Sequence, residues 1–519
     1  MNQIFTYGIL KNLFKRRMNM TTFIIGLIIL IVGGFFYGKF CEKVFGPDDR
    51  PTPAIAKADG VDYVGMGKWR NSLIELLNIA GTGPILGPIQ GILFGPVAFI
   101  TIPIGCVLAG SMHDYFVGML SMRNEGAQMP KMIGKYLGSK THKIYNIVVW
   151  ILLLLTGTVF IYTPGDLIVS DILGQDPSFD NPVLWIVYLA IFAYYLIATL
   201  FPIDKIIGRI YPIFGAVLIL SAVGIFGGIM LDGGVNLTSL SFSTNILGQH
   251  PSDLSFFPVF FITVACGIMS GFHSTQSTLI SRAVTHEKEG RTTFFNMMLV
   301  EGFIAMVWAA GAMVLFNVGT PVDTSATLMI GEVSRYFLGS IGAVFAILGV
   351  IVLPITSGDT AFRSLRLMIA ETFNIDQVDY KKRLGISAGI FVVAAGILVF
   401  SKSSPNGFNL LWRYFGFTNQ LIAVFALAMV SVYLRGHSKN YLISLIPGTF
   451  YCMVVASYIF HEKIGFGLES RIGGLFGVDA NSYMISYILG AICAILYAWT
   501  VAKVGKQRQM GKLQNKNVE

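Results

Sequence analysis

The sequence predicts an all-α polytopic membrane protein with about 13 transmembrane helices. Two of these helices are expected to be discontinuous, within a five-plus-five inverted repeat. The chain is 54% hydrophobic and only 13% charged, with a mean hydropathy of +0.67, whereas soluble globular proteins are about a quarter charged. Its apolar residues occur in runs of roughly 18 or more, the length that a helix needs to cross a bilayer. Two runs carry helix-breaking residues in corresponding positions.

The apolar runs place the spans and the units of the chain. We expect spans at about 21–41, 72–96, 97–120, 143–169, 183–201, 206–231, 254–283, 292–318, 338–368, 384–401, 408–434, 441–460 and 482–503. Residues 1–71 then hold an N-terminal extension, the first transmembrane helix and a cytoplasmic linker. Residues 72–231 form the first repeat and 254–435 the second. Residues 436–519 add two transmembrane helices and a basic cytoplasmic tail.

Lysine and arginine predict the orientation. They gather in alternate loops and in the C-terminal tail, which places the C-terminus in the cytoplasm and the protein in a bacterial inner membrane. The intervening loops 170–182 and 232–253 contain neither residue. An odd number of spans puts the N-terminus outside, in conflict with the basic residues at 11–17, and a start at Met18 or Met20 would remove this conflict. The net charge of +9 therefore indicates a membrane protein rather than a nucleic-acid partner.

Motifs of other functional classes are missing from the sequence. The five cysteines form no CxxC pair, so the sequence indicates neither disulfides nor a zinc site. No P-loop, HExxH or GxSxG motif indicates an ATP-driven engine or a hydrolase. We therefore expect no enzyme, no catalytic residues, no metal and no cofactor beyond a coupling ion, H⁺ or Na⁺. The sequence does not predict the oligomeric state.

The first break lies in the run 72–96. The segment from Asn78 to Pro88 contains two Gly-Pro steps, and each proline lacks an N–H group and clashes with the preceding helical turn. Unsatisfied backbone groups are costly in lipid, so such a break must line protein or a wet cavity.

The second break lies in the run 254–283, about five spans later. The segment from Gly267 to Ser277 contains two glycines, a histidine, a glutamine and four hydroxyl residues. Broken helices at corresponding positions are typical of inverted-repeat transporters, in which half-helix N-termini bind anionic groups and free carbonyls bind a cation. The alternative is that glycine and proline only permit a kink or close packing. The binding interpretation assigns the substrate contacts to Asn78, Gly81, Thr82, Gly83, Ser270, His273, Ser274 and Gln276.

Ionisable residues inside spans are functional candidates because a bilayer makes them expensive. Asp114 follows His113 in the third span, and Asp166 lies near the outer end of the fourth, where helix-end capping is the alternative. Asp359 is four residues before Arg363 and could pair with it on one helix face. The ion-coupling candidates are Asp114, Asp166, Thr356, Ser357, Asp359 and Thr360, whose oxygens suit a cation.

Other polar residues receive weaker assignments. Glu301 and Glu371 are expected near span ends or the cytoplasmic face, and neither is given a role. Asn419 and Gln420 are interpreted as amides that line a cavity.

A series of motifs resembles the carbon starvation protein A (CstA) family. In chain order they are Pro47-Asp-Asp-Arg-Pro-Thr-Pro53, Asp59-Gly-Val-Asp-Tyr63, Gly81-Thr-Gly-Pro84, His113-Asp114 with Leu120-Ser-Met-Arg123, Ser270-Gly-Phe-His-Ser-Thr-Gln-Ser277, Ser357-Gly-Asp-Thr-Ala-Phe-Arg363, and Trp412-Arg-Tyr-Phe-Gly416 with Asn419-Gln420. The resemblance covers residues 39–435. The chain departs from the family in lacking extra spans near the C-terminus of many members and in its basic N-terminal extension.

The resemblance implies a fold and a function. Members of that family are described as inner-membrane transporters of pyruvate or of peptides, induced in nutrient starvation. They belong to the amino acid–polyamine–organocation (APC) superfamily, with a LeuT-like five-plus-five repeat, which implies H⁺- or Na⁺-coupled symport. We therefore expect a symporter whose partners are the bilayer and a small carboxylate-bearing substrate. The alternative is a channel or sensor-like membrane protein without coupled transport, although channels more often repeat a short pore unit or form rings of like charge.

Overall fold

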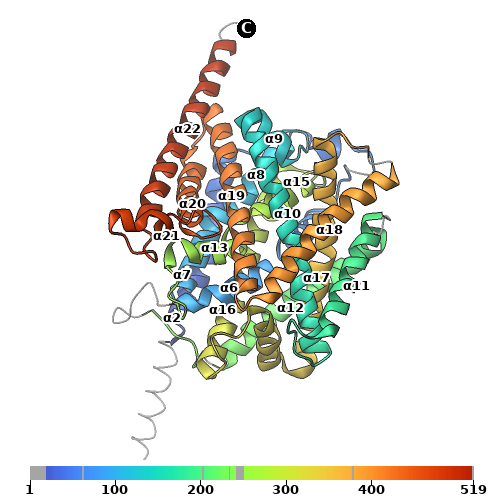
Figure 1. The fold of residues 1–519 in the computed structure, drawn as a ribbon. Helices are drawn as coiled ribbons and strands as arrows, with labels where there is room; N and C mark the ends of the chain where they lie inside the picture. Colours follow the sequence, from blue (N-terminus) through green and yellow to red (C-terminus); the bar gives the residue numbers. More distant parts are fainter. Residues whose placement is uncertain are drawn as a thin grey trace, which may run out of the picture.

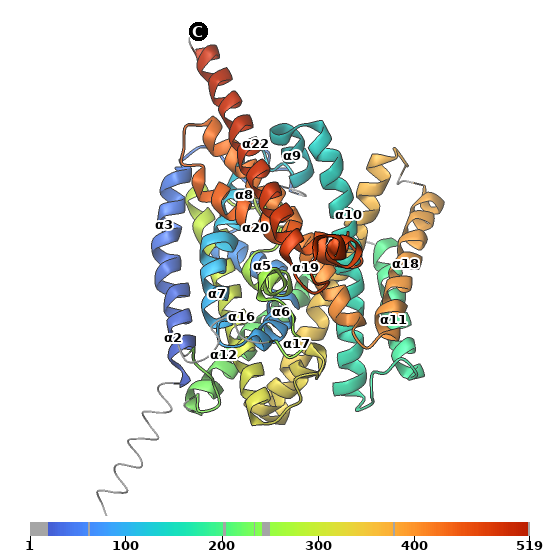
Figure 2. The same ribbon diagram turned by 60° about the vertical axis from the view of Figure 1, so that its left-hand side comes forward.

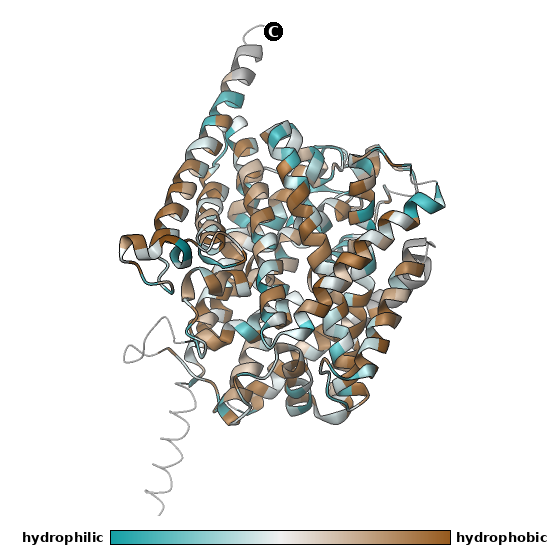
Figure 3. Ribbon diagram, in the orientation of Figure 1, coloured by the Kyte–Doolittle hydropathy of each residue, from teal (hydrophilic) through white to brown (hydrophobic). Residues whose placement is uncertain are grey.

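The computed structural model describes residues 19–60, 63–200, 204–232, 234–240, 250–376 and 379–516. These residues form a bundle of helices, and α22 projects from one end of it (Figure 1). The bundle end opposite to that projection holds the start of α2 (Figure 2). Apolar residues run along the outer helices, while hydrophilic residues gather towards the projecting end of α22 (Figure 3). The basic residues at 11–17 lie outside the described residues.

The helices account for most of the described chain. Their bounds are α2 Thr21–Ile28, α3 Gly34–Phe45, α4 Pro53–Ala56, α5 Lys68–Ile79, α6 Gly83–Gly91, α7 Ala98–Gly105, α8 Met112–Arg123, α9 Met129–Leu137, α10 Ser139–Leu167, α11 Pro182–Leu200, α12 Asp204–Leu231, α13 Phe261–Thr263, α14 Ala265–Ile268, α15 Gly271–Ile280, α16 Asn296–Val318, α17 Ala326–Thr372, α18 Tyr380–Ser403, α19 Gly407–Gly436, α20 Leu442–His461, α21 Leu468–Ile472 and α22 Met484–Lys516. Short π-helical turns join several of them, including η3 (Cys106–Ser111), η5 (Phe256–Phe260) and η7 (Arg291–Phe295).

The described residues contain nine helices that are long and apolar enough to span a membrane. The bent pair α5 and α6 adds a tenth if it counts as one span. Two further apolar helices, Pro182–Ala198 and Gly215–Leu231, are shorter, and the second broken span is interrupted. The sequence-based count of 13 is therefore higher than the number of long apolar helices, and it stays a prediction together with the inverted repeat.

The long helices of the bundle pack against one another in groups. Helices α10 and α17 pack along each other, α12 packs on α17, and α19, α20 and α22 form a group beside them. Helix α17 starts earlier than the expected span 338–368. Its first part is set off by a kink at Gly339, whose φ of 66° lies in the left-handed region that favours glycine.

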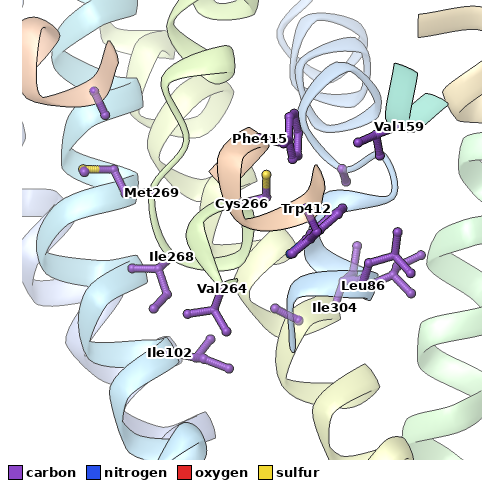
Figure 4. Packing of buried hydrophobic residues seen from close by; sticks show 14 of the residues in the cluster. Leu86, Ile102, Val159, Val264, Cys266, Ile268, Met269, Ile304, Trp412 and Phe415 are labelled. Atoms are coloured by element: carbon purple, nitrogen blue, oxygen red, sulfur yellow. The ribbon is translucent and has the colours of Figure 1, made fainter. Parts of the chain in front are cut away.

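The two broken spans lie against each other in the interior. A Cβ atom on Gly83 of α6 would lie 2.4 Å from the Cβ of Cys266, and one on Gly87 would lie 2.9 Å from the carbonyl oxygen of Thr263. Cys266 and Trp412 lie among the apolar side chains at this contact (Figure 4). The glycines of the first break therefore permit close packing, as the alternative interpretation of the sequence expected, and they also bring the two breaks together.

Candidate functional site

The first break separates α5 from α6, and the two helices diverge by 51°. Pro84 stands in the first turn of α6, where a missing N–H group costs no helical hydrogen bond. Thr82 is the N-cap of α6, and its buried hydroxyl makes no hydrogen bond within the described residues. Gly83 is also buried, whereas Asn78 and Gly81 are half-buried. The first break therefore offers a helix N-terminus with a buried hydroxyl that is free for a ligand.

The second break lies between α14 and α15. Met269 and Ser270 both have extended backbone conformations, so the helical hydrogen bonds stop there and resume from Gly271. Asn419 of α19 fills the resulting gap: its Oδ1 accepts hydrogen bonds from the Ser270 hydroxyl at 2.8 Å and from the Phe272 N–H at 3.1 Å. The N-terminus of α15 is therefore already capped by a side chain in this conformation.

Helix α19 also donates hydrogen bonds to the part of the chain before the second break. The amide nitrogen of Gln420 donates to the carbonyl oxygen of Phe261, and the indole nitrogen of Trp412 donates to that of Thr263 at 2.9 Å. These bonds give carbonyl groups of the second broken span partners on α19. Asn419 and Gln420, interpreted from the sequence as cavity-lining amides, are buried and hold the break in shape.

A cluster of buried ionisable residues lies beside the second break. Both oxygens of Asp114 of α8 lie within hydrogen-bond distance of a histidine ring nitrogen, His113 Nδ1 at 2.7 Å and His273 Nδ1 at 3.0 Å. The opposite ring nitrogen of His273 lies 3.5 Å from Oε2 of Glu301. All four residues are at most 1% exposed. The structure thus joins Asp114, an expected ion-coupling residue, to His273, an expected substrate-binding residue.

Glu75 of α5 is the fifth member of this cluster. Its Oε1 accepts a hydrogen bond from the Ser277 hydroxyl of α15 at 2.6 Å, and its side chain is fully buried. The carboxylate lies within electrostatic range of Asp114 and Glu301. The cluster therefore collects side chains from α5, α8, α15 and α16, which include both broken spans.

The sequence interpretation missed two members of the cluster. The expectation that Glu301 lies near a span end was wrong, because it is buried in the interior on α16. A signal was available, since Glu301 is the one charged residue between Arg291 and Asp323. Glu75 gave no such signal because it lies close to Lys68 and Arg70 in a mixed helix.

The remaining substrate candidates make local contacts. The Ser274 hydroxyl donates to the carbonyl oxygen of Gly271, and the Gln276 amide donates to the hydroxyl of Thr275. Both residues are buried on α15, next to His273 in the chain.

Asp166 lies apart from the cluster in a buried ion pair. Lys402 of α18 approaches its Oδ2 to 2.8 Å, and the Tyr188 hydroxyl of α11 donates to its Oδ1 at 2.6 Å. Lys402 also donates to the carbonyl oxygen of Pro177 at 2.7 Å. This arrangement joins α10, α11 and α18, so Asp166 has a partner that the sequence did not indicate.

Asp359 also lies in a separate group, on α17. It pairs with Arg363 at 3.9 Å, which confirms the pairing expected from their spacing, and the Tyr194 hydroxyl of α11 donates to it at 3.4 Å. Thr356 donates to helix carbonyls and Thr360 is exposed, while Ser357 is half-buried. The expected ion-coupling residues therefore fall into three separate places in the fold.

The segment between α3 and α5, which we name the strap (residues 46–60 and 63–67), is bound to the chain beyond α15. The Met66 N–H donates to the carbonyl oxygen of Ala283 at 2.9 Å, and the Asp48 N–H donates to Glu287 Oε2 at 3.0 Å. The Thr52 hydroxyl donates to the carbonyl oxygen of Thr285 at 3.3 Å. Because α5 follows the strap directly, these bonds hold α5 against the end of α15.

Ion pairs reinforce the strap. Arg123 at the end of α8 binds both oxygens of the buried Glu287, with one contact at 2.7 Å, and also donates to the carbonyl oxygen of Gly46 at 3.1 Å. Asp48 accepts two hydrogen bonds from the Arg50 guanidinium, which hold the pKa of that carboxyl well below its usual range. These charges therefore stay paired at neutral pH.

Comparison with known proteins places the chain in a family. The family model described as "Carbon starvation protein CstA" matches residues 18–203, 181–336 and 324–457. An uncharacterized membrane protein of Haemophilus influenzae is 42% identical in a match that covers 56% of this chain and 90% of that protein. The peptide transporter CstA of Helicobacter pylori is 25% identical in a match that covers 84% of this chain and 80% of the relative. The peptide transporter CstA of Escherichia coli K12 is 24% identical in a match that covers 78% of this chain and 75% of that protein.

Solved structures give a likeness in fold. The manganese transporter of Eremococcus coleocola superposes with a TM-score of 0.50 at 14% identity, covering 87% of this chain and 98% of that chain. The relatives with a named activity are transporters and not enzymes. The chain is therefore a multi-pass membrane transport protein that belongs to the carbon starvation protein CstA family.

Proposed function

We propose that this protein is a secondary active symporter that takes up a small carboxylate-bearing nutrient, a short peptide or pyruvate, during carbon starvation. The observation that carries the proposal is the buried cluster of Asp114, His273 and Glu301 beside the two facing breaks. Intramembrane ionisable residues in such positions are typical of proton relays. Relatives named as peptide transporters support the substrate class.

The substrate carboxylate binds at the first break. A helix N-terminus favours negative charge through its free N–H groups and its dipole. Helix α6 begins with the free hydroxyl of Thr82, whereas the N-terminus of α15 is capped by Asn419. A peptide also needs an acidic partner for its amine, and Asp114 is the candidate, because Asp166 is paired with Lys402.

The coupling ion is a proton. The cluster combines carboxylates with imidazole nitrogens, and both kinds of group can take up and release a proton. A sodium site is built from oxygen ligands, and Thr356, Ser357 and Asp359 on α17 are the candidates for that alternative. The inner membrane and a cytoplasmic C-terminus complete the proposal, in line with the positive loops.

Transport by purified protein in proteoliposomes tests this function. Labelled alanylalanine and labelled pyruvate are offered under separately imposed H⁺ and Na⁺ gradients, with His273→Ala and Asp359→Asn beside the wild type. We expect accumulation above equilibrium with an inward H⁺ gradient, weaker accumulation in His273→Ala, and full retention in Asp359→Asn.

Other outcomes would overturn parts of the proposal. Accumulation driven by Na⁺ and lost in Asp359→Asn would replace proton coupling by sodium coupling on α17. A downhill flux that ignores both gradients and both substitutions would refute symport and favour a channel.

A further inference from the structure

The buried cluster contains more carboxylates than positive partners. Glu75, Asp114 and Glu301 are each fully buried, on α5, α8 and α16. An ionised carboxylate in a dry interior is costly unless hydrogen-bond donors or a positive charge compensate it, and otherwise the group takes up a proton. The partners of each carboxylate therefore indicate which one is ionised in this closed conformation.

Asp114 is the compensated carboxylate. A ring nitrogen lies within hydrogen-bond distance of each oxygen, from His113 at 2.7 Å and from His273 at 3.0 Å. An ionised carboxylate only accepts hydrogen bonds, so both Nδ1 atoms carry a hydrogen and donate it. Two such bonds stabilise the ionised form. Asp114 thus orients His273 and keeps its charge.

Glu301 and His273 together hold one proton. With Nδ1 of His273 committed to Asp114, its Nε2 is an acceptor in the neutral ring or a donor in the imidazolium. Glu301 lies 3.5 Å from Nε2, and neither of its oxygens makes a hydrogen bond within the described residues. A protonated glutamate facing a neutral ring and an ionised glutamate facing an imidazolium contain the same single proton. The nearby thiols of Cys106 and Cys266 supply no positive charge.

Glu75 holds a second proton. Ser277 donates to its Oε1, but its buried Oε2 has no partner in the described part of the chain. Among the side chains that the structure describes, the carboxylates within electrostatic range of Glu75 are Asp114 and Glu301, which are both acidic. One neutral hydrogen bond does not compensate a buried charge, so the proton resides on Oε2.

We infer that the cluster binds two exchangeable protons, one on Glu75 and one shared by Glu301 and His273, and that each transport cycle moves both. This inference rests on the proposed proton coupling and assigns its carriers and its stoichiometry. Both protons enter from water on one side, stay while the cluster is dry, and leave to water on the other side. Glu75 gives up its proton when α5 separates from α15 and water reaches it.

The coupling ratio tests this inference directly. A pH difference of one unit is imposed across the membrane of proteoliposomes at zero membrane potential. The concentration ratio of labelled alanylalanine or pyruvate across the membrane is then varied, and the ratio at which net substrate flux stops is measured. Each coupled proton raises this balancing gradient about tenfold, so two protons give about 100-fold. We expect about 100-fold for the wild type and about tenfold for Glu75→Gln and for Glu301→Gln. Glu371→Gln, at an exposed end of α17, is the matched control and keeps the wild-type ratio.

The outcomes separate this inference from the proposed function. A wild type that ignores the pH difference would refute proton coupling itself. A proton-coupled wild type whose ratio is unchanged in both glutamine variants would overturn the assignment and leave the symport intact.

Infrared spectroscopy reports the protonation of a carboxyl group even in a variant that no longer transports. Protonated carboxyl groups have an infrared C=O band that shifts in heavy water. Purified wild-type protein should show such a band from Glu75, which Glu75→Gln removes and Glu371→Gln retains. Absence of any band that Glu75→Gln removes would refute the second proton site.

Discussion

The contact between α19 and the second broken span predicts a large effect of one methyl group. A Cβ atom on Gly416 would lie 2.1 Å from the carbonyl oxygen of Ile262 and 3.6 Å from the Cβ of Ala265. Ordinary van der Waals contacts of a Cβ begin at 3.4 Å, so Gly416→Ala forces α19 away from the break by more than an ångström. Overpacking of this kind costs about 1–3 kcal/mol.

The neighbouring hydrogen bonds add to the cost of Gly416→Ala. Gln420 lies one helical turn further along the same helix, and its bond to Phe261 weakens as α19 retreats. A hydrogen bond of this type contributes about 0.5–1.5 kcal/mol. Alanine favours helix by about 1 kcal/mol over glycine, which offsets part of the loss. We expect a net destabilisation of about 1–3 kcal/mol.

Thermal unfolding of the purified protein in detergent measures this effect. Gly396→Ala in α18 is the matched control, because nothing lies within 4 Å of a Cβ there. The same chemical change should lower the unfolding midpoint at Gly416 and leave it equal or raise it at Gly396. Equal midpoints for the two variants would show that α19 does not rest on the carbonyl groups of the broken span.

Three further predictions concern other parts of the fold. Lys402→Ala leaves Asp166 as a buried, unpaired charge and should lower the free energy of unfolding by about 3–5 kcal/mol. Adding Asp166→Asn in a double variant should restore part of this loss, and unfolding midpoints measure both effects. Met66 and Val284 form a β-bridge, so cysteines at these two positions should form a disulfide that stops uptake until it is reduced. Full uptake by the cross-linked protein would exclude movement of the strap during transport. Burial lowers the pKa of His250 to about 4, below its usual value of about 6.5. Stability is therefore complete above about pH 6.5 and falls as the pH drops towards 4, and the difference in midpoint between pH 7.5 and 5 should shrink in His250→Gln.

The breaks were predictable from the sequence because their cause is local. The first Gly-Pro step starts α6, because proline is favoured in the first turn of a helix, so the bend before it follows from the segment after Asn78 itself. The second step did not break the helix as expected, since Pro88 lies inside α6. The spacing of four between Asp359 and Arg363 likewise predicts their pairing, since it is a property of one helix. The substrate and ion roles given to these residues remain predictions.

The partners across the fold were not predictable in the same way. Glu75 and Ser277 are 202 residues apart, and Asp166 and Lys402 are 236 apart. No periodicity within one helix encodes such a pair, because packing between helices determines it. Glu301 shows the same limit, since its position in a span was visible but the histidine that faces it was not.

The bonds from α19 to the second break have a consequence for how the protein is made. The backbone groups of Phe261, Thr263 and Phe272 find their partners on residues 147 to 159 positions later in the chain. Synthesis therefore delivers the interrupted helix to the membrane well before Trp412, Asn419 or Gln420 exist. Hydrocarbon does not tolerate free peptide groups, so the segment must remain in a wetter or protein-lined place until α19 arrives. Release of this half of the molecule into lipid is thus a late and concerted event. A truncated chain that lacks α19 cannot satisfy these backbone groups, so we expect it to be degraded by membrane quality-control proteases.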